Sequence, residues 1–122
     1  MEYNNEQAIY LQIADMICEK VLDKQWIAEE RIPSVRELAG SFQVNPNTIM
    51  RTYGYLQQEK IIHNQRGIGY FLSADALNKT RSLKREQFLT KELPNFMKIS
   101  NLLDYDIQEL TTLITNYKNE NK

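Results

Sequence analysis

The stretch RIPSVRELAGSFQVNPNTIMRTYGYLQQE, residues 31–59, decides the fold of this chain. Near its start, Ser34 is followed three residues later by Glu37. This is the spacing of a capping box, in which the two side chains each satisfy a backbone amide at the start of a helix. The apolar face of that helix is supplied by Val35, Leu38, Ala39 and Phe42. We expect a short helix over about residues 34–41.

A second helix start follows a tight corner in the same stretch. Asn45 can cap this helix, and Pro46 can occupy its first turn, where the missing N–H of proline is no loss. After it come apolar residues at helical spacing, namely Ile49, Tyr53 and Leu56. The pattern predicts a helix over about residues 46–59.

The regions on either side of these two helices complete one small domain. Upstream, apolar residues four apart predict an amphipathic helix from about Glu6 to Asp23, and they are Ile9, Ile13, Ile17 and Val21. Downstream, the β-prone runs 61–63 and 70–72 flank a glycine-bearing tip, which indicates a β-hairpin. We therefore place a domain of three helices and a two-stranded wing in residues 1–75.

Residues 76–122 form a helical tail. A basic, leucine-bearing helix is expected over about 76–99, with a bend or break near Pro94, and a last helix is expected to begin at Asp104 as N-cap. The apolar stripe of the last helix has little within one chain to cover it, so we expect it to form a dimer interface made of Ile107, Leu110, Ile114 and Tyr117. Two such helices are expected to be too short to enclose an effector pocket of the usual volume, roughly 300–1,000 Å³.

Charge is distributed unevenly over the 122 residues. The net charge is only −1, but residues 31–66 carry five basic and two acidic side chains, and residues 79–98 carry six basic and two acidic ones. The first thirty residues are acidic, with seven acids and two lysines. Because charge interactions are screened within about 8–10 Å at physiological salt, a basic centre can still meet a phosphate backbone.

Several classes of protein are disfavoured by composition. One cysteine, Cys18, and one histidine, His63, are too few for an internal disulfide or a structural zinc site, and no catalytic group of residues is apparent. We expect no enzyme activity, no cofactor and no metal. The apolar runs are too short to cross a membrane, and the N-terminus lacks the features of a signal peptide, so a cytoplasmic protein is expected.

The order of elements, three helices and then a hairpin, is that of a winged helix-turn-helix, whose third helix is of a size to enter the major groove of DNA. The overall class is mainly α, with the two-helix dimerisation tail following the wing. Side chains that suit base edges or phosphates gather in these elements. The candidate DNA-binding residues are Ser34, Arg36, Asn45, Asn47, Thr48, Arg51, Arg66 and Gly67.

At these residues the chain resembles the GntR family of bacterial transcription regulators, and within it the short YtrA-like branch. The matching segments occur in order over about residues 3–73, and they are YLQIAD (10–15), RIPSVRELA (31–39), VNPNTIMRTY (44–53) and RGIGYF (66–71). The resemblance implies sequence-specific DNA binding as a homodimer. It also implies contacts from Arg36, from the start of the third helix and from the wing-tip glycine, Gly67.

This sequence departs from the family pattern at four positions. Lys24, Glu29 and Lys60 stand where the family often has glycine, which is expected to alter turns but not the reading surface. Met50 stands where many relatives carry an arginine, so part of the base reading is expected to lie with Arg51.

Two functions compete at this point. The first is a transcriptional regulator, most simply a repressor, that occupies a palindromic double-stranded operator as a homodimer. The alternative is a winged-helix module for protein–protein contact or RNA binding, in which the third helix is structural. The sequence does not indicate the operator, the regulated genes or a small-molecule effector.

Overall fold

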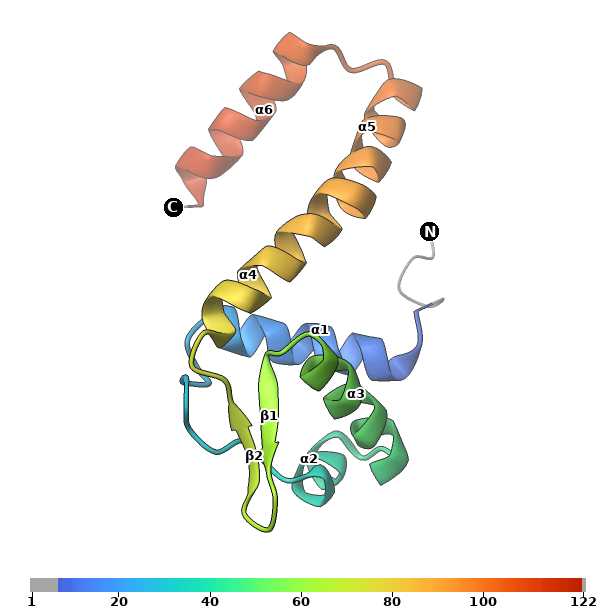
Figure 1. Ribbon diagram of the computed structural model, residues 1–122. Coiled ribbons are helices and arrows are strands. Elements are labelled where there is room, and N and C mark those ends of the chain that lie inside the picture. The colour runs from blue at the N-terminus through green and yellow to red at the C-terminus, as the bar shows by residue number, and fades with distance from the viewer. Residues whose placement is uncertain (1–6, 122) are drawn as a thin grey trace. The chain divides into compact units, whose positions relative to one another are not determined.

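The computed structural model describes residues 7–121, which divide into two compact units after Lys84. The first unit begins with three helices, α1 (Ile9–Leu22), α2 (Val35–Phe42) and α3 (Pro46–Gln58). Two antiparallel strands follow, β1 (Ile62–Gln65) and β2 (Gly69–Leu72), and then α4 (Ala76–Gln87) begins (Figure 1). The expected winged helix-turn-helix is confirmed. The expected start of the first helix at Glu6 lies outside the described residues.

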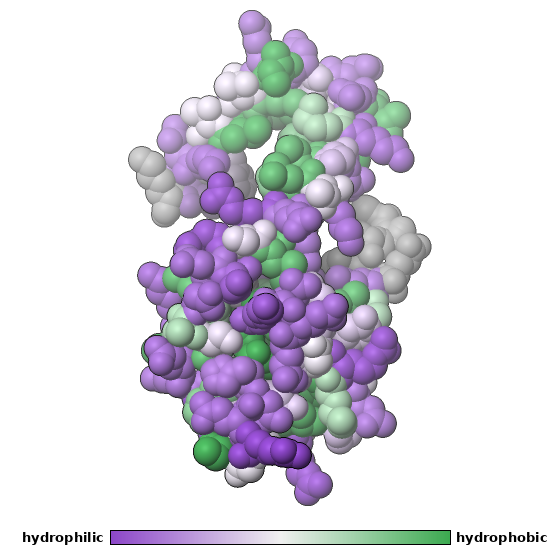
Figure 2. Space-filling model, in the orientation of Figure 1, coloured by the Kyte–Doolittle hydropathy of each residue, from purple (hydrophilic) through white to green (hydrophobic). Residues whose placement is uncertain are grey.

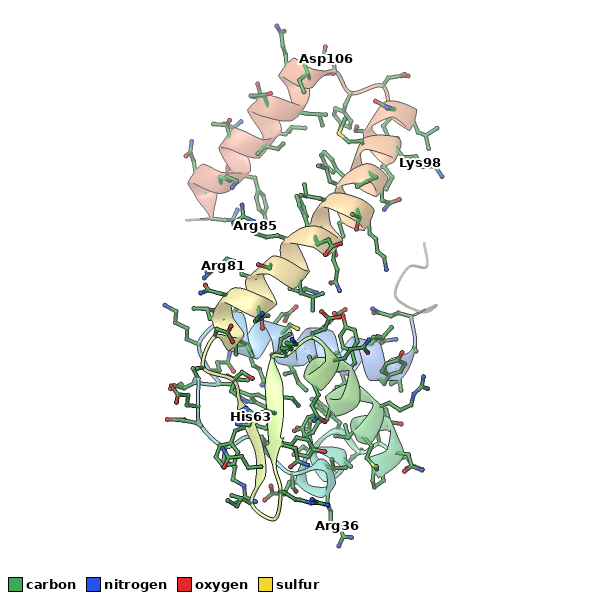
Figure 3. The ribbon with its side chains drawn as sticks, viewed as in Figure 1. Arg36, His63, Arg81, Arg85, Lys98 and Asp106 are labelled. Carbon is green, nitrogen blue, oxygen red and sulfur yellow. The ribbon has the colours of Figure 1, made fainter. Side chains whose placement is uncertain are left out.

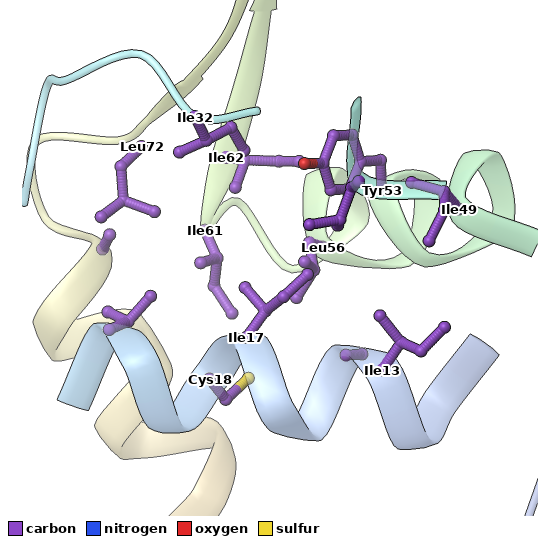
Figure 4. Close-up of a cluster of buried hydrophobic side chains, with 14 of the residues drawn as sticks. Ile13, Ile17, Cys18, Ile32, Ile49, Tyr53, Leu56, Ile61, Ile62 and Leu72 are labelled. Atoms are coloured by element: carbon purple, nitrogen blue, oxygen red, sulfur yellow. The ribbon is translucent and has the colours of Figure 1, made fainter. Parts of the chain in front are cut away.

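The core of this unit lies between α1, α3 and the base of the wing (Figure 4). The apolar stripe of α1 packs against the inner face of α3, and the strands close the space beside them. Fully buried side chains include Ile17, Ile49, Tyr53, Leu56 and Ile61. The stripes expected from the sequence are thus mostly the faces that are buried, because removing apolar surface from water drives these elements together. The exception in α1 is Ile9, which is 51% exposed.

The ends of α2 and α3 follow the expected capping patterns. Ser34 Oγ accepts from the Glu37 amide at 3.0 Å, and Glu37 Oε1 accepts from the Ser34 amide at 2.9 Å. At the corner after α2, Gln43 adopts a left-handed conformation with φ 55°. Asn45 Oδ1 then accepts from the Asn47 amide at 2.8 Å and begins α3. These caps fix where each helix starts and so which residues lie in its first turn.

The wing is longer than the sequence suggested. Its strands pair from Ile62 opposite Leu72 to Gln65 opposite Gly69, so the turn at the tip is confined to residues 66–68. The segment before α2 also pairs with β2, through the Ile32 amide to the Tyr70 oxygen at 2.9 Å and the Leu72 amide to the Glu30 oxygen at 3.0 Å. The wing is therefore attached to the helical part by backbone hydrogen bonds along its second strand.

The tail differs in two details from the expectation. The α-helix is interrupted before Pro94 by a π-helical turn at Phe88–Glu92, in which the Leu93 amide donates to the Phe88 oxygen, and α5 (Leu93–Leu102) follows. A proline lacks the N–H that would continue the ladder, and a π turn is one way to accommodate that loss. The last helix, α6 (Ile107–Glu120), does not begin at Asp104.

Asp106 is the N-cap of α6, and our assignment of Asp104 was wrong. Asp106 forms a capping box with Glu109, in which the carboxylate oxygens accept backbone amides at 2.8 and 2.9 Å. Asp104 lies in the connection between the helices with φ 63°. The spacing Asp106-x-x-Glu109 is the signal that distinguishes the two aspartates.

The start of α4 belongs to the first unit, which therefore extends beyond residue 75. Ala76 and Thr80 are fully buried, and Lys84 Nζ lies 3.1 Å from Asp15 Oδ1 on α1. None of the helices in the described part of the chain is long and apolar enough to span a membrane.

Two buried threonines, Thr52 and Thr80, allow a test of how a hydrogen bond to a buried hydroxyl affects the stability of this core. Thr52 Oγ1 donates to the Tyr10 oxygen at 2.8 Å and lies 3.1 Å from the Thr48 oxygen, whereas Thr80 Oγ1 has no hydrogen-bond partner within the described chain. We expect Thr52→Val to lower the free energy of unfolding by about 1–2 kcal/mol. Thr80→Val should leave it unchanged or raise it by up to about 1 kcal/mol, because a buried hydroxyl without a partner is costly. Urea denaturation of the two variants measures both values, and an equal loss in both would contradict the assignment.

Candidate nucleic-acid interface

The first turn of α3 presents polar side chains outward. Asn45 and Asn47 are exposed, and Thr48 is half-buried. The cap uses only the side-chain oxygen of Asn45, so the NH₂ group of that amide can still donate. The helix N-terminus also carries unpaired backbone N–H groups, which favour anions such as phosphate. This end of α3 can therefore offer donors to both bases and phosphates.

The start of α2 has the same character. Ser34 Oγ accepts a hydrogen bond in the capping box, which leaves its O–H free to donate. The hydrogen bond from the backbone amide of Ser34 lowers the pKa of the Glu37 carboxyl most, and the hydrogen bond with the Ser34 side chain lowers it further. This carboxyl therefore stays charged and remains an acceptor in the capping box. Arg36 lies two residues after the cap, is exposed and points away from the helical core (Figure 3).

Arg51 is positioned by a residue of α1. Its guanidinium carbon lies 4.1 Å from the centre of the Tyr10 ring, which is cation–π geometry. The arginine remains exposed on α3, so this contact orients it on the side nearest α1 without burying its charge. No local pattern in the sequence indicates the contact of Tyr10 with Arg51, which lies 41 residues further along the chain.

The wing tip is a tight turn. The Ile68 amide donates to the Gln65 oxygen at 2.8 Å, and Gly67 has φ 80°, a left-handed conformation that favours glycine. Arg66 is exposed beside it. The predicted wing residues Arg66 and Gly67 thus both lie in the turn itself.

Arg31 is an exposed basic residue beside the wing that was not among the candidates. Its Nε lies 2.9 Å from the point where a Cβ on Gly69 would stand, and Gly69 has φ 144°. The guanidinium therefore rests against the backbone of the wing in a space that only glycine leaves open. Its place in the basic stretch 31–66 was the available signal, but the close approach to Gly69 depends on tertiary pairing.

Tyr53 joins the three elements that carry these side chains. It is fully buried in α3, its hydroxyl donates to the Pro33 oxygen at 2.7 Å, and its ring meets Tyr70 of β2 edge-on at 4.8 Å. Burial raises the pKa of the Tyr53 hydroxyl, so it stays protonated and able to donate. The start of α2, the body of α3 and the second strand of the wing are thereby held around one ring.

Cys18 and His63 are residues of types that often take part in catalysis or metal binding. Cys18 is buried in the core, and burial raises the pKa of its thiol to about 11, so the reactive thiolate is scarce near neutral pH. His63 is exposed on the wing, where its ring stacks on Phe71 (Figure 3). No three His, Cys, Asp or Glu residues in the described region are arranged to hold a metal ion.

The second unit contains an open apolar groove between α5 and α6. The groove has a volume of about 490 Å³, and apolar residues gather around this hollow in Figure 2. It is lined mainly by Phe96, Ile99, Leu103, Leu113, Ile114 and Tyr117. We expected two helices of this length not to enclose a pocket of the usual volume. The hollow does reach that volume, because the helices do not fill the space between them, but it is an open groove and not an enclosed pocket.

The four proposed interface residues of α6 differ in exposure. Ile107, Ile114 and Tyr117 are exposed at 71%, 47% and 67%, whereas Leu110 is only 8% exposed. Leu110 lines the inner side of the groove and is already buried within its own chain.

The family model for bacterial regulatory proteins of the gntR family matches residues 9–72, slightly more than half of the chain. This chain belongs to the GntR family. The matched residues run from the first residue of α1 to the last residue of β2, so they contain all the candidate DNA-binding residues.

Two curated relatives come from Bacillus subtilis. The HTH-type transcriptional regulator YhcF is 40% identical over 62% of this chain, and the HTH-type transcriptional repressor YtrA is 37% identical over 69% of it. These matches span 62% and 63% of the lengths of the two relatives. Both are named as transcription regulators and not as enzymes.

Solved structures of GntR proteins share the fold. A GntR-family regulator from Bacteroides thetaiotaomicron is 43% identical, with a TM-score of 0.79 over 94% of this chain and all of that one. The DNA-binding domain of AraR, solved in complex with its operator ORR3, is 25% identical, with a TM-score of 0.51 over 52% of this chain and 77% of that one.

The three positions at which this GntR chain lacks the expected glycine all have left-handed backbones. Lys24, Glu29 and Lys60 have φ values of 63°, 69° and 63°. L-residues pay about 1–2 kcal/mol in this region because Cβ approaches the following carbonyl. The turns are therefore retained in the geometry that suits glycine, at a cost in stability.

Lys60→Gly should relieve this strain. Part of the gain is offset by the greater freedom of glycine in the unfolded chain, so we expect the free energy of unfolding to rise by about 0.5–1 kcal/mol. The matched control is Gln57→Gly in the last turn of α3, which should lower it by about 1 kcal/mol. Thermal and urea unfolding of the two variants measure this, and destabilisation by Lys60→Gly would show that the lysine side chain has a stabilising role of its own.

Proposed function

We propose that this chain binds a specific double-stranded DNA operator as a homodimer and represses transcription from it. The observation that carries the proposal is the exposed polar surface at the N-termini of α2 and α3, which Tyr53 holds together with the wing. Helix-turn-helix proteins read base edges with the N-terminal part of the second helix of the motif, here α3, while neighbouring elements contact the backbone.

The side chains suit different parts of DNA. Asn47 has the donor and acceptor that pair with adenine, and Arg51 can bind guanine or, held by Tyr10, an adjacent phosphate. Ser34, Asn45 and Thr48 offer donors to phosphates near the two helix N-termini, and Arg36 offers its charge there. Arg66 and Gly67 place a cation and bare backbone at the tip of the wing, where the minor groove or the backbone would be met.

The relatives support both DNA binding and repression. AraR carries a similar domain and was solved on an operator, and YtrA is named a repressor. Such a regulator would act where bacterial DNA lies, in the cytoplasm. A protein–protein or RNA-binding module is the alternative, and it predicts no preference among DNA sequences.

Dimerisation is supported by the exposed apolar surface of the second unit. Twelve of the seventeen large hydrophobic side chains found exposed in the described chain lie beyond residue 84. Ser100 and Leu110 are the two buried residues of the described part of this unit. A contiguous apolar surface of this kind marks an interaction site. We propose that the second unit, which follows Lys84, forms the dimerisation segment and that a second copy of this chain covers the groove.

A two-fold dimer also fits operator recognition. An isologous contact would place two copies of α3 about one turn of DNA apart, which matches a palindromic site. Two linked half-site contacts bind far more tightly than one, so dimer formation and operator affinity would be coupled.

The DNA-binding surface can be tested at Arg36. We expect Arg36→Ala to weaken binding of the full-length protein to its operator by about 1–3 kcal/mol and to lessen the salt dependence of binding. The control is Arg81→Ala, because Arg81 is an exposed arginine of α4 well separated from Arg36 (Figure 3). Fluorescence anisotropy with the chain's own promoter fragment and with random duplex gives these values. Equal binding of both duplexes by the unaltered protein would reject the proposed function.

The dimer interface can be tested at Ile114. Ile114→Asp places a charge in the apolar groove and should shift the protein to a monomer and reduce operator affinity at least tenfold. Thr115→Asp, on the adjacent exposed position of α6, should leave both properties nearly unchanged. Sedimentation equilibrium decides the oligomeric state, and a stable dimer of the Ile114→Asp variant would place the interface elsewhere.

A further inference from the structure

Met50 is an exposed apolar residue within the proposed reading surface. It lies in the second turn of α3, and 58% of it is accessible to solvent. The neighbouring apolar residues of this helix, Ile49 and Tyr53, are fully buried. Met50 is therefore not part of the core, and its side chain is available to whatever meets the outer face of α3.

The position of Met50 relative to the polar residues is favourable for reading DNA. Asn47 precedes it by three residues, a spacing that places two side chains side by side on a helix. Arg51 is drawn toward α1 by Tyr10. Met50 and Asn47 are thus left as adjacent side chains that face outward from the first two turns of α3.

Gly54 is the second observation. It lies one turn after Met50 and is exposed, and a Cβ built on it would meet nothing within 4 Å. Glycine is unfavourable inside a helix, and nothing within the chain requires it here. Its effect is to leave the helix backbone bare directly beyond Met50, so that another molecule can approach closely.

We propose that Met50 reads thymine in the major groove, with Gly54 allowing the close approach of α3. The thioether chain carries no charge and no strong hydrogen-bond donor, so it suits neither phosphate nor the polar edge of guanine. The C5-methyl of thymine is the apolar group that the major groove offers, and apolar side chains are its usual partners. This inference rests on the proposed function, because it assumes that α3 enters the major groove.

The experiment begins by selecting preferred duplexes from a random library with the full-length protein. Each thymine of the selected site is then replaced singly by uracil, which pairs identically but lacks the methyl group. We expect one symmetry-related thymine position at which uracil weakens binding about three- to fivefold, the value for one buried methyl-sized group. Met50→Ala should bind the thymine and uracil duplexes equally at that position. Met16→Ala, which alters an exposed methionine of α1, should retain the full difference.

Gly54→Ala supplies an independent readout. Alanine favours the helix and meets no neighbour, so the melting temperature should rise, while affinity for the selected site should fall at least fivefold. A merely structural glycine would change the first value and not the second.

These measurements distinguish a failure of the proposed function from a failure of the role assigned to Met50. Failure to select any preferred duplex would overturn the proposed function together with this inference. A selected site at which no uracil substitution matters, or at which Met50→Ala keeps the same loss, would overturn the role of Met50 and leave the proposed function standing.

Discussion

The reading surface depends on the burial of one tyrosine. Tyr53 must face inward at the centre of α3, where its hydroxyl reaches the Pro33 oxygen at 2.7 Å and its ring meets Tyr70. Because the hydroxyl bonds directly to the residue before the α2 cap, the start of α2 has one position relative to α3. Because the ring contacts β2, the wing is held to the same helix. The start of α2, the middle of α3 and the second strand of the wing are thereby held in fixed positions around Tyr53.

The caps of the two helices serve both stability and the proposed recognition. In Ser34 and Asn45 the side-chain oxygen accepts a backbone amide, which fixes the helix start. The hydroxyl hydrogen of Ser34 and the NH₂ group of Asn45 are left for an outside acceptor. A residue can therefore be a cap and a DNA contact at once, since the two roles use different atoms. Substitution of either residue would change stability and recognition together.

The sequence was most informative where the determining contacts are local. The caps at Ser34 and Asn45 were predicted correctly, and so was the stripe of α1 apart from its first member, Ile9, because each depends on residues within one or two turns. The choice between Asp104 and Asp106 shows that an aspartate alone does not identify a helix cap. Only Asp106 has a glutamate three residues later, and Asp106 is the cap. The contacts of Tyr10 with Arg51 and of Arg31 with Gly69 could not be predicted, because they join residues brought together by packing. The groove between α5 and α6 likewise depends on how closely the helices pack.

The division of burial between the two units bears on how such a protein could be regulated. The first unit has a core of its own, including Ala76 and Thr80 at the start of α4. Within its own chain, the described part of the second unit buries little more than Ser100 and Leu110. Most of its stabilisation would then come from a partner that covers its apolar groove. If a second copy does so, any molecule that competes for the groove would weaken the dimer. By linkage it would also weaken operator binding, without touching α3. On that hypothesis, a short regulator of this kind would not need a separate effector domain to respond to a ligand, because the proposed interface contains a hollow of about 490 Å³.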